Sequence, residues 1–257
     1  MKTTPKALHL AVLIDADNAP ASVIEGILEE TARLGTATVR RIYGDWTSPH
    51  LGGWKKVLLK HSIQPIQQFA YTSGKNATDS ALIIDAMDLL HTHRFGGFCL
   101  VSSDSDFTRL AQRIREGGCV VYGFGERKTP QPFVAACDRF VYTDLLREEQ
   151  EGASPARSAK GEGADDAAGT SLPDPVQLIR RAIGEADDDE DGWAPLATVG
   201  TFLNQIRPDF DPRLFGHSKL SDLVRAHDRH FELHSQAIPG SNAQRMAVRV
   251  KPGRKRR

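Results

Sequence analysis

The chain has 257 residues, of which 40% are hydrophobic, and its 33 Lys and Arg residues balance 33 Asp and Glu residues. This length allows one large domain or two smaller ones, and the balanced charge selects no class of partner by itself. The three cysteines have no metal-ligand spacing and indicate neither a zinc site nor a disulfide framework. No apolar run reaches the roughly 18 residues of a membrane span, so we expect no membrane partner, no targeting signal and a cytoplasmic location.

Residues 1–146 alternate strand and helix patterns. The apolar run at 8–14 predicts a strand covered on both faces, and the helical spacing at 20–35 predicts the helix that follows it. Because strands alternate with crossover helices, we expect an α/β fold with a mostly parallel sheet and helices on both faces. Further strands are predicted at 36–44, 63–71, 97–103, 119–125 and within 131–146, and further helices at 51–62, 77–93, 105–118 and within 131–146.

The composition changes after about residue 146. Residues 147–172 are rich in Gly, Ala, Ser and charge, which predicts a flexible linker. Apolar periodicity returns in a second domain at 173–250, where Asp174 is expected to cap a helix that starts at Pro175. This domain is predicted to be a small α+β unit with helices at 174–183, 193–206 and 215–228, two strands at 230–235 and 245–250 that pair as a β-wing, and a basic tail at 251–257.

Two carboxylates directly follow predicted strands of the first domain. Asp15 ends the first strand, and Asp104 lies just beyond the fourth. In a parallel α/β sheet, ligands bind beyond the carboxyl ends of the strands. Because an unpaired buried carboxylate is costly, we expect Asp15 in particular to have a functional role.

Asp79 lies in the first turn of the helix predicted at 77–93. Stepping back one helical turn from Leu82 and Ile83, which belong to the apolar stripe, reaches Asp79, so we expect it to face the core at the same edge of the sheet. Asp85 and Asp88 lie off this stripe and are expected to be solvated. Helix capping is the alternative for Asp79, although Thr78 could cap instead.

Asp104 and Asp106 open a helix after a strand, and capping alone could explain one of them. It does not explain why they would meet Asp15 and Asp79 at one edge. Asn18 could cap the first helix or hold a ligand, and Asp17 is expected to face solvent.

Three or four converging carboxylates can all stay ionised only if a cation neutralises them. Oxygen ligands favour Mg²⁺ or Mn²⁺, and His91 and His93 lie at the far end of their helix. Such an ion can orient water and stabilise an in-line phosphoryl displacement. We therefore predict phosphodiester hydrolysis, with Asp15, Asp79, Asp104 and Asp106 as metal ligands and catalytic residues.

Other motifs are weaker. The first strand is not followed by a dinucleotide fingerprint, and Gly74–Lys75 lacks the Walker spacing. A second enzyme hypothesis takes Asp15 and Asp17 as the nucleophile and acid of a D-x-D phosphatase, but Ala19 departs from that signature. A third hypothesis is a catalytically inactive RNA-binding or scaffold protein.

Three segments, "VLIDADNAP", "KNATD" and "VSSDSDF", together resemble the NYN domain of the LabA-like group, a PIN-like nuclease fold. The resemblance covers about residues 6–146 and implies a Mg²⁺- or Mn²⁺-dependent endoribonuclease with aspartate ligands. Ser103 stands where the family often has Gly. The family motif falls on Asp15, Asn18, Lys75, Asp79, Ser102, Asp104, Asp106 and Phe107, of which Asn18, Lys75 and Ser102 are expected to contact the substrate.

The second domain, in particular "FGHSKLSDLV" followed by "FEL", resembles the OST-HTH (LOTUS) domain, a winged-helix module. This resemblance implies RNA binding or docking of a protein partner, with Lys219 and Arg225 as candidates to face phosphate. Ordinary surface charge is the alternative. Homo-oligomerisation is left open.

Basic and aromatic side chains near the proposed site are further candidates to contact RNA. Lys75 is the best candidate to meet an RNA backbone, and Trp46 or Tyr71 could stack on bases, although Trp46 is expected to be partly buried. The other basic candidates, which are more typical of solvated surfaces, are Arg40, Arg41, Lys55 and Lys56.

Overall fold

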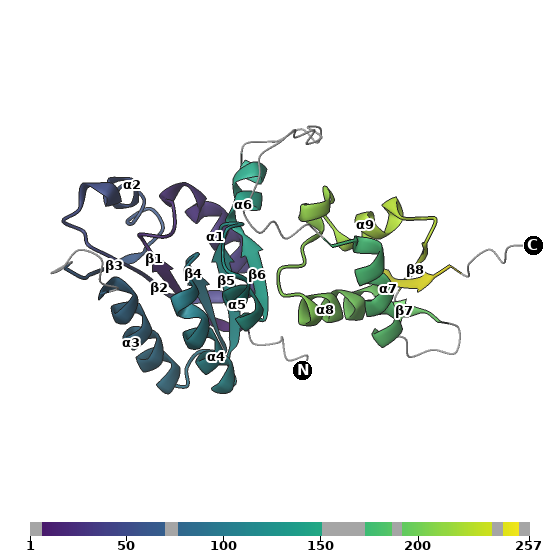
Figure 1. Cartoon of the computed structure of the whole chain (residues 1–257), viewed down its shortest axis with the longest axis horizontal. Coiled ribbons are helices and arrows are strands. Elements are labelled where there is room, and N and C mark those ends of the chain that lie inside the picture. The colour runs from purple at the N-terminus through teal and green to yellow at the C-terminus, as the bar shows by residue number, and fades with distance from the viewer. Residues whose placement is uncertain (1–6, 70–76, 151–172, 187–191, 238–243, 252–257) are drawn as a thin grey trace, which may run out of the picture. The chain divides into compact units, whose positions relative to one another are not determined.

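The computed structural model describes residues 7–69, 77–150, 173–186, 192–237 and 244–251. The chain divides into two compact units, Met1–Gly152 and Ala153–Arg257, each of which has its own sheet (Figure 1). The residues of the predicted linker from 151 onward, and the basic tail after Lys251, lie outside the described residues.

The first unit is built on a six-stranded sheet in the order β3-β2-β1-β4-β5-β6. Every neighbouring pair is parallel. This confirms the predicted α/β fold. The strands are β1 (His9–Asp15), β2 (Thr36–Gly44), β3 (Gln64–Gln67), β4 (Gly97–Val101), β5 (Val120–Gly125) and β6 (Arg139–Tyr142).

Helices connect these strands in chain order. The helix predicted at 51–62 ends at Lys55 and the strand predicted at 63–71 ends at Gln67, so both predictions were wrong in extent, and helix α6 extends to Gln150. The helices are α1 (Ile24–Leu34), α2 (Gly52–Lys55), α3 (Ala77–His91), α4 (Thr108–Glu116), α5 (Gln131–Ala136) and α6 (Thr143–Gln150), with short 3-10 turns η1 (Ala21–Val23), η2 (Pro49–Leu51) and η3 (Ser105–Phe107).

Alternation along β1 assigns side chains to the two faces of the sheet. Leu10, Val12 and Ile14 pack in one core cluster together with residues of α1. Asp15 therefore projects, like Leu13, to the opposite face, on which α3 contacts β1 and β2. Figure 1 shows α3 and α4 side by side, and α3 also contacts α4. The end of β1 thus faces the helix that carries Asp79.

In its described residues, the second unit contains three helices and a three-stranded antiparallel sheet in the order β7-β9-β8. The backbone N–H of Val176 donates to Oδ1 of Asp174 at 2.9 Å, so Asp174 caps α7 as predicted. The second helix starts later than predicted because Ala194 and Pro195 pair with β9 instead. The elements are α7 (Pro175–Ala186), β7 (Ala194–Pro195), α8 (Leu196–Ile206), η4 (Pro212–Phe215), α9 (Leu220–Ala226), β8 (Phe231–Ala237) and β9 (Gln244–Val250).

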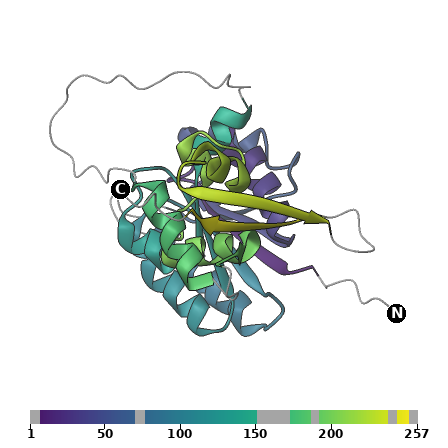
Figure 2. The same cartoon turned by 90° about the vertical axis from the view of Figure 1, so that its right-hand side faces the viewer.

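The predicted β-wing is present as the antiparallel pair of β8 and β9, drawn as the long yellow-green ribbon in Figure 2. It packs against the helices through a core that includes Ile179, Leu203, Leu223 and Val248. The small α+β unit is therefore confirmed. Among the helices that the structure describes, none is long and apolar enough to cross a membrane.

Candidate metal centre

Asp15 is the last residue of β1 and is fully buried, with 0% of its surface exposed. Its oxygens accept three hydrogen bonds: Oδ1 from the backbone N–H of Asp17 at 3.1 Å, and Oδ2 from Asn18 Nδ2 at 2.7 Å and from Ser102 Oγ at 2.8 Å. Burial raises the pKa of Asp15, and these hydrogen bonds oppose the rise. This environment does not favour Asp15 as a phosphatase nucleophile.

Ser102 and Asn18 hold this carboxylate in place. Ser102 is 2% exposed, and besides donating to Asp15 its hydroxyl accepts the backbone N–H of Asp104 at 3.1 Å. Asn18 does not cap the first helical turn, because Pro20 occupies that position without a side-chain cap. Ser102 thus links the Asp15 carboxylate to the turn that carries Asp104, and its predicted contact with the substrate stays a prediction.

Asp104 and Asp106 come from the turn after β4. Asp104 occupies the N-cap of η3, where its Oδ1 accepts the backbone N–H of Asp106 at 2.9 Å. Asp106 is exposed, whereas Asp104 is partly buried. The cap orients one oxygen of Asp104 along the backbone, so the second oxygen stays available to a ligand. Capping and a ligand role are therefore compatible at this residue.

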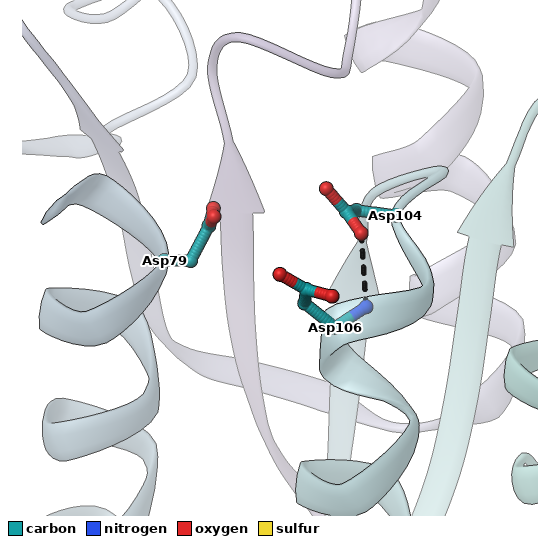
Figure 3. Close-up of side chains that lie close together, drawn as sticks. All are labelled: Asp79, Asp104 and Asp106. Atoms are coloured by element: carbon teal, nitrogen blue, oxygen red, sulfur yellow. Dashed lines mark hydrogen bonds between the residues drawn. The ribbon is translucent and has the colours of Figure 1, made fainter. Parts of the chain in front are cut away.

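Asp79 reaches the same place from α3. It lies in the first turn of that helix, partly buried, and Figure 3 shows its carboxylate directed toward Asp104 and Asp106. One oxygen of each of these three carboxylates lies within 4.8 Å of the others. Asp15 lies outside this group of three. The structure thus brings together three of the four predicted acidic residues.

The spacing of these oxygens fits a small divalent cation. Ligand distances of about 2.0–2.1 Å to Mg²⁺ place two opposite ligands roughly 4.2 Å apart and adjacent ones closer. The observed limit of 4.8 Å exceeds that by an amount that a small side-chain rotation closes. An all-carboxylate donor set also suits Mg²⁺ or Mn²⁺ better than a soft metal.

The raised pKa of Asp79 is consistent with a site that binds a cation. Burial, together with the charges of Asp15, Asp104 and Asp106, raises the pKa of its carboxyl to about 6. Like charges gathered in a partly buried place disfavour ionisation unless a cation joins them. A bound divalent ion would remove this penalty.

The remaining predicted residues fall in several places. Lys75 and Tyr71 lie outside the described residues. Lys219 is exposed at the N-cap of α9, and together with Arg245 it lines a cleft of about 650 Å³ in the second unit. Trp46 is partly buried as expected, and its Nε1–H donates to the carbonyl of Ile66 at 3.0 Å.

Asp85 was wrongly expected to be solvated. Its oxygens accept hydrogen bonds from the Arg41 guanidinium and the Tyr43 hydroxyl. Arg41 is therefore engaged within the protein, and Arg40 likewise donates to the carbonyl of His61 at 2.9 Å. Asp88, by contrast, is exposed as predicted. The alternation along β2 is the sequence signal that could have predicted a contact between Tyr43 and α3, because it places Tyr43 on the same face of the sheet as Arg41.

Comparison with known families agrees with this architecture. The family model of the NYN domain matches residues 9–146, and that of the OST-HTH/LOTUS domain matches residues 170–242. No curated protein matches the chain.

Two solved structures show similarity to parts of the chain. A crystal structure of a protein of unknown function from Vibrio parahaemolyticus is 18% identical with a TM-score of 0.46, and the match covers 55% of this chain and 95% of that one. A solution NMR structure of an uncharacterized protein from Nitrosomonas europaea is 33% identical with a TM-score of 0.30, over 40% of this chain and 96% of that one.

Proposed function

Because the chain belongs to the NYN-domain family, whose model spans residues 9–146, we propose that it is a Mg²⁺- or Mn²⁺-dependent endoribonuclease. The observation that carries this proposal is the convergence of Asp79, Asp104 and Asp106 at the carboxyl edge of a parallel sheet. When bound, the ion supplies positive charge that polarises a phosphodiester and activates water. We further propose the domain division 1–146, 147–172 and 173–250, and a cytoplasmic location.

The side chains of the site have different proposed roles. In this proposal Asp79, Asp104 and Asp106 hold the ion. Asp15 adds negative charge beside Asp79, and its predicted role as a direct ligand stays a prediction, since Oδ1 retains one lone pair beyond its bond to the Asp17 N–H. Ser102 and Asn18 keep the Asp15 carboxylate in one orientation.

We propose that the second unit binds RNA, in keeping with its match to the OST-HTH/LOTUS domain. Exposed Lys219 and Arg245 on one cleft provide positive charge for phosphate oxygens. Lys75 remains a proposed backbone contact in the first unit. A protein partner for the second unit and homo-oligomerisation stay predictions.

A cleavage assay tests the proposed activity. The full chain is incubated with single- and double-stranded RNAs in Mg²⁺, Mn²⁺ or EDTA, beside Asp104→Asn and Asp79→Asn. Asp88→Asn is the matched control, because Asp88 is an exposed carboxylate on the same helix as Asp79. We expect internal cleavage that EDTA and both site variants abolish and that the control retains.

Cleavage that persists equally in EDTA and in both site variants would point to a contaminant. RNA binding without cleavage under any metal condition would favour the inactive RNA-binding or scaffold protein. A covalent phosphate trapped on Asp15 would favour the phosphatase hypothesis.

A further inference from the structure

Strand β2 presents two polar side chains to α3. In register, Arg41 pairs with Leu13 of β1, and Tyr43 pairs with Asp15. Neighbouring residues of parallel strands at one level point to the same face, so Arg41 and Tyr43 project toward the helix that carries Asp79. The backbone N–H of Ala16 also donates to the carbonyl of Tyr43 at 3.0 Å, which ties this part of β2 to the end of β1.

Asp85 on α3 receives both of these side chains. The Tyr43 hydroxyl donates to its Oδ2 and the Arg41 guanidinium to its Oδ1. Tyr43 is fully buried, while the side chains of Arg41 and Asp85 are only 27% and 23% exposed. A buried hydroxyl needs an acceptor, and hydrogen bonds to a charged group away from bulk water are stronger and more directional than a surface ion pair.

This contact lies on the same rigid element as a proposed metal ligand. Asp85 follows Asp79 by six residues of continuous helix, a rise of about 9 Å. The apolar contacts of α3, through residues such as Leu82 and Ala86, are non-directional and specify its position along the sheet only loosely. Two directional hydrogen bonds from β2 specify that position more closely.

We propose that Asp85 is a positioning residue for the metal centre: by accepting hydrogen bonds from Arg41 and Tyr43, it fixes the height and rotation of α3 so that Asp79 meets Asp104 and Asp106. This inference rests on the proposed metal site and assigns a function to a carboxylate that contacts neither the ion nor RNA. The unit that acts is Asp85 with its two donors, linked through Tyr43 to the backbone of β1.

The test measures Mn²⁺ affinity of the full chain by titration calorimetry, without RNA. Asp85→Asn removes the charge, and Tyr43→Phe removes only the hydroxyl and preserves the buried ring. We expect each to weaken Mn²⁺ binding by about 10- to 100-fold, as is typical of residues that orient metal ligands. Asp88→Asn, an exposed carboxylate on the same helix, should change it by less than about twofold.

Two further variants separate positioning from general stability. Ile114→Val removes a methyl group from a fully buried residue of α4 and should lower the melting temperature, but it should leave Mn²⁺ affinity unchanged. In an Asp79→Asn background, Asp85→Asn should produce no further loss, because the ligand that Asp85 positions is already gone.

The inference is overturned if Asp85→Asn and Tyr43→Phe bind Mn²⁺ like Asp88→Asn, or if Asp85→Asn weakens binding equally with and without Asp79. It is also overturned if Ile114→Val weakens binding as much as they do. If the unsubstituted chain does not bind Mn²⁺, the metal site itself fails, which is a different result from binding that is insensitive to Asp85.

Discussion

The hydroxyl of Ser102 donates to Oδ2 of Asp15 across 2.8 Å and joins the ends of strands β4 and β1. The same hydroxyl accepts the backbone N–H of Asp104. One small side chain therefore connects the buried carboxylate with the turn that carries two of the proposed ligands. This link explains why a serine directly after β4 matters to the site.

Ser102→Ala should lower the unfolding free energy by about 1.5–3 kcal/mol, since it leaves a buried carboxylate with one fewer donor. Mn²⁺ affinity should fall as well, because Asp104 loses an anchor. Calorimetric melting and Mn²⁺ titration of the full chain measure both effects. Ser105→Ala, at an exposed position in the same turn, is the control and should change neither. Equal behaviour of the two variants would contradict the role of Ser102.

Asp79 should make stability depend on pH. Its folded pKa of about 6 lies above the ordinary value of 3.8. Its favourable contribution to the unfolding free energy is therefore complete below pH 3.8 and is lost as pH rises through about 6. At pH 7.5 without metal, Asp79→Asn should therefore have an unfolding free energy about 1 kcal/mol higher than that of the unsubstituted chain, once solvent screening of this partly exposed group is discounted. It should accordingly melt at a higher temperature.

That difference should disappear near pH 4. Added Mn²⁺ should stabilise the unsubstituted chain above pH 6 and leave Asp79→Asn unaffected. Asp88→Asn controls for the loss of a carboxylate elsewhere on α3. The same melting temperature for Asp79→Asn and the unsubstituted chain at pH 7.5 would show that the carboxylates do not repel one another as inferred.

Lys219→Ala should weaken RNA binding in a salt-dependent way. If Lys219 meets one phosphate of single-stranded RNA, its removal should reduce the slope of log affinity against log salt concentration by about 0.7. Fluorescence anisotropy at several salt concentrations measures this slope. Lys60→Ala is a suitable control, because the Lys60 ammonium already pairs with Glu25 at 2.9 Å. An unchanged slope in Lys219→Ala would remove this residue from the RNA interface.

Much of the architecture follows from local sequence patterns. The buried run before Asp15 and the alternation of strands with helices are sufficient for the parallel sheet, and helical periodicity predicts that Asp79 faces inward. These features depend on residues close together in the sequence. The capping of α7 by Asp174, beside Pro175, is predictable for the same reason.

Features that depend on distant partners were not predictable in this way. Asp85 lies off the apolar stripe of α3, so the pattern alone predicts that it is solvated, yet α3 also contacts β2, whose Arg41 and Tyr43 bind Asp85. Likewise Ala194 and Pro195 form a strand because β9 pairs with them, which no helical pattern reveals. Asp15, which lies outside the group of three carboxylates, likewise accepts a hydrogen bond from a residue distant in sequence, Ser102.

In the proposed site, Asp79, Asp104 and Asp106 hold one divalent cation between them. Anomalous X-ray scattering from crystals of the full chain grown with Mn²⁺ tests it most directly. We predict an anomalous peak at about 2.0–2.3 Å from an oxygen of each of the three carboxylates, absent from crystals of Asp79→Asn. A peak elsewhere in the molecule, or no peak at Mn²⁺ concentrations that support RNA cleavage, would contradict this metal site.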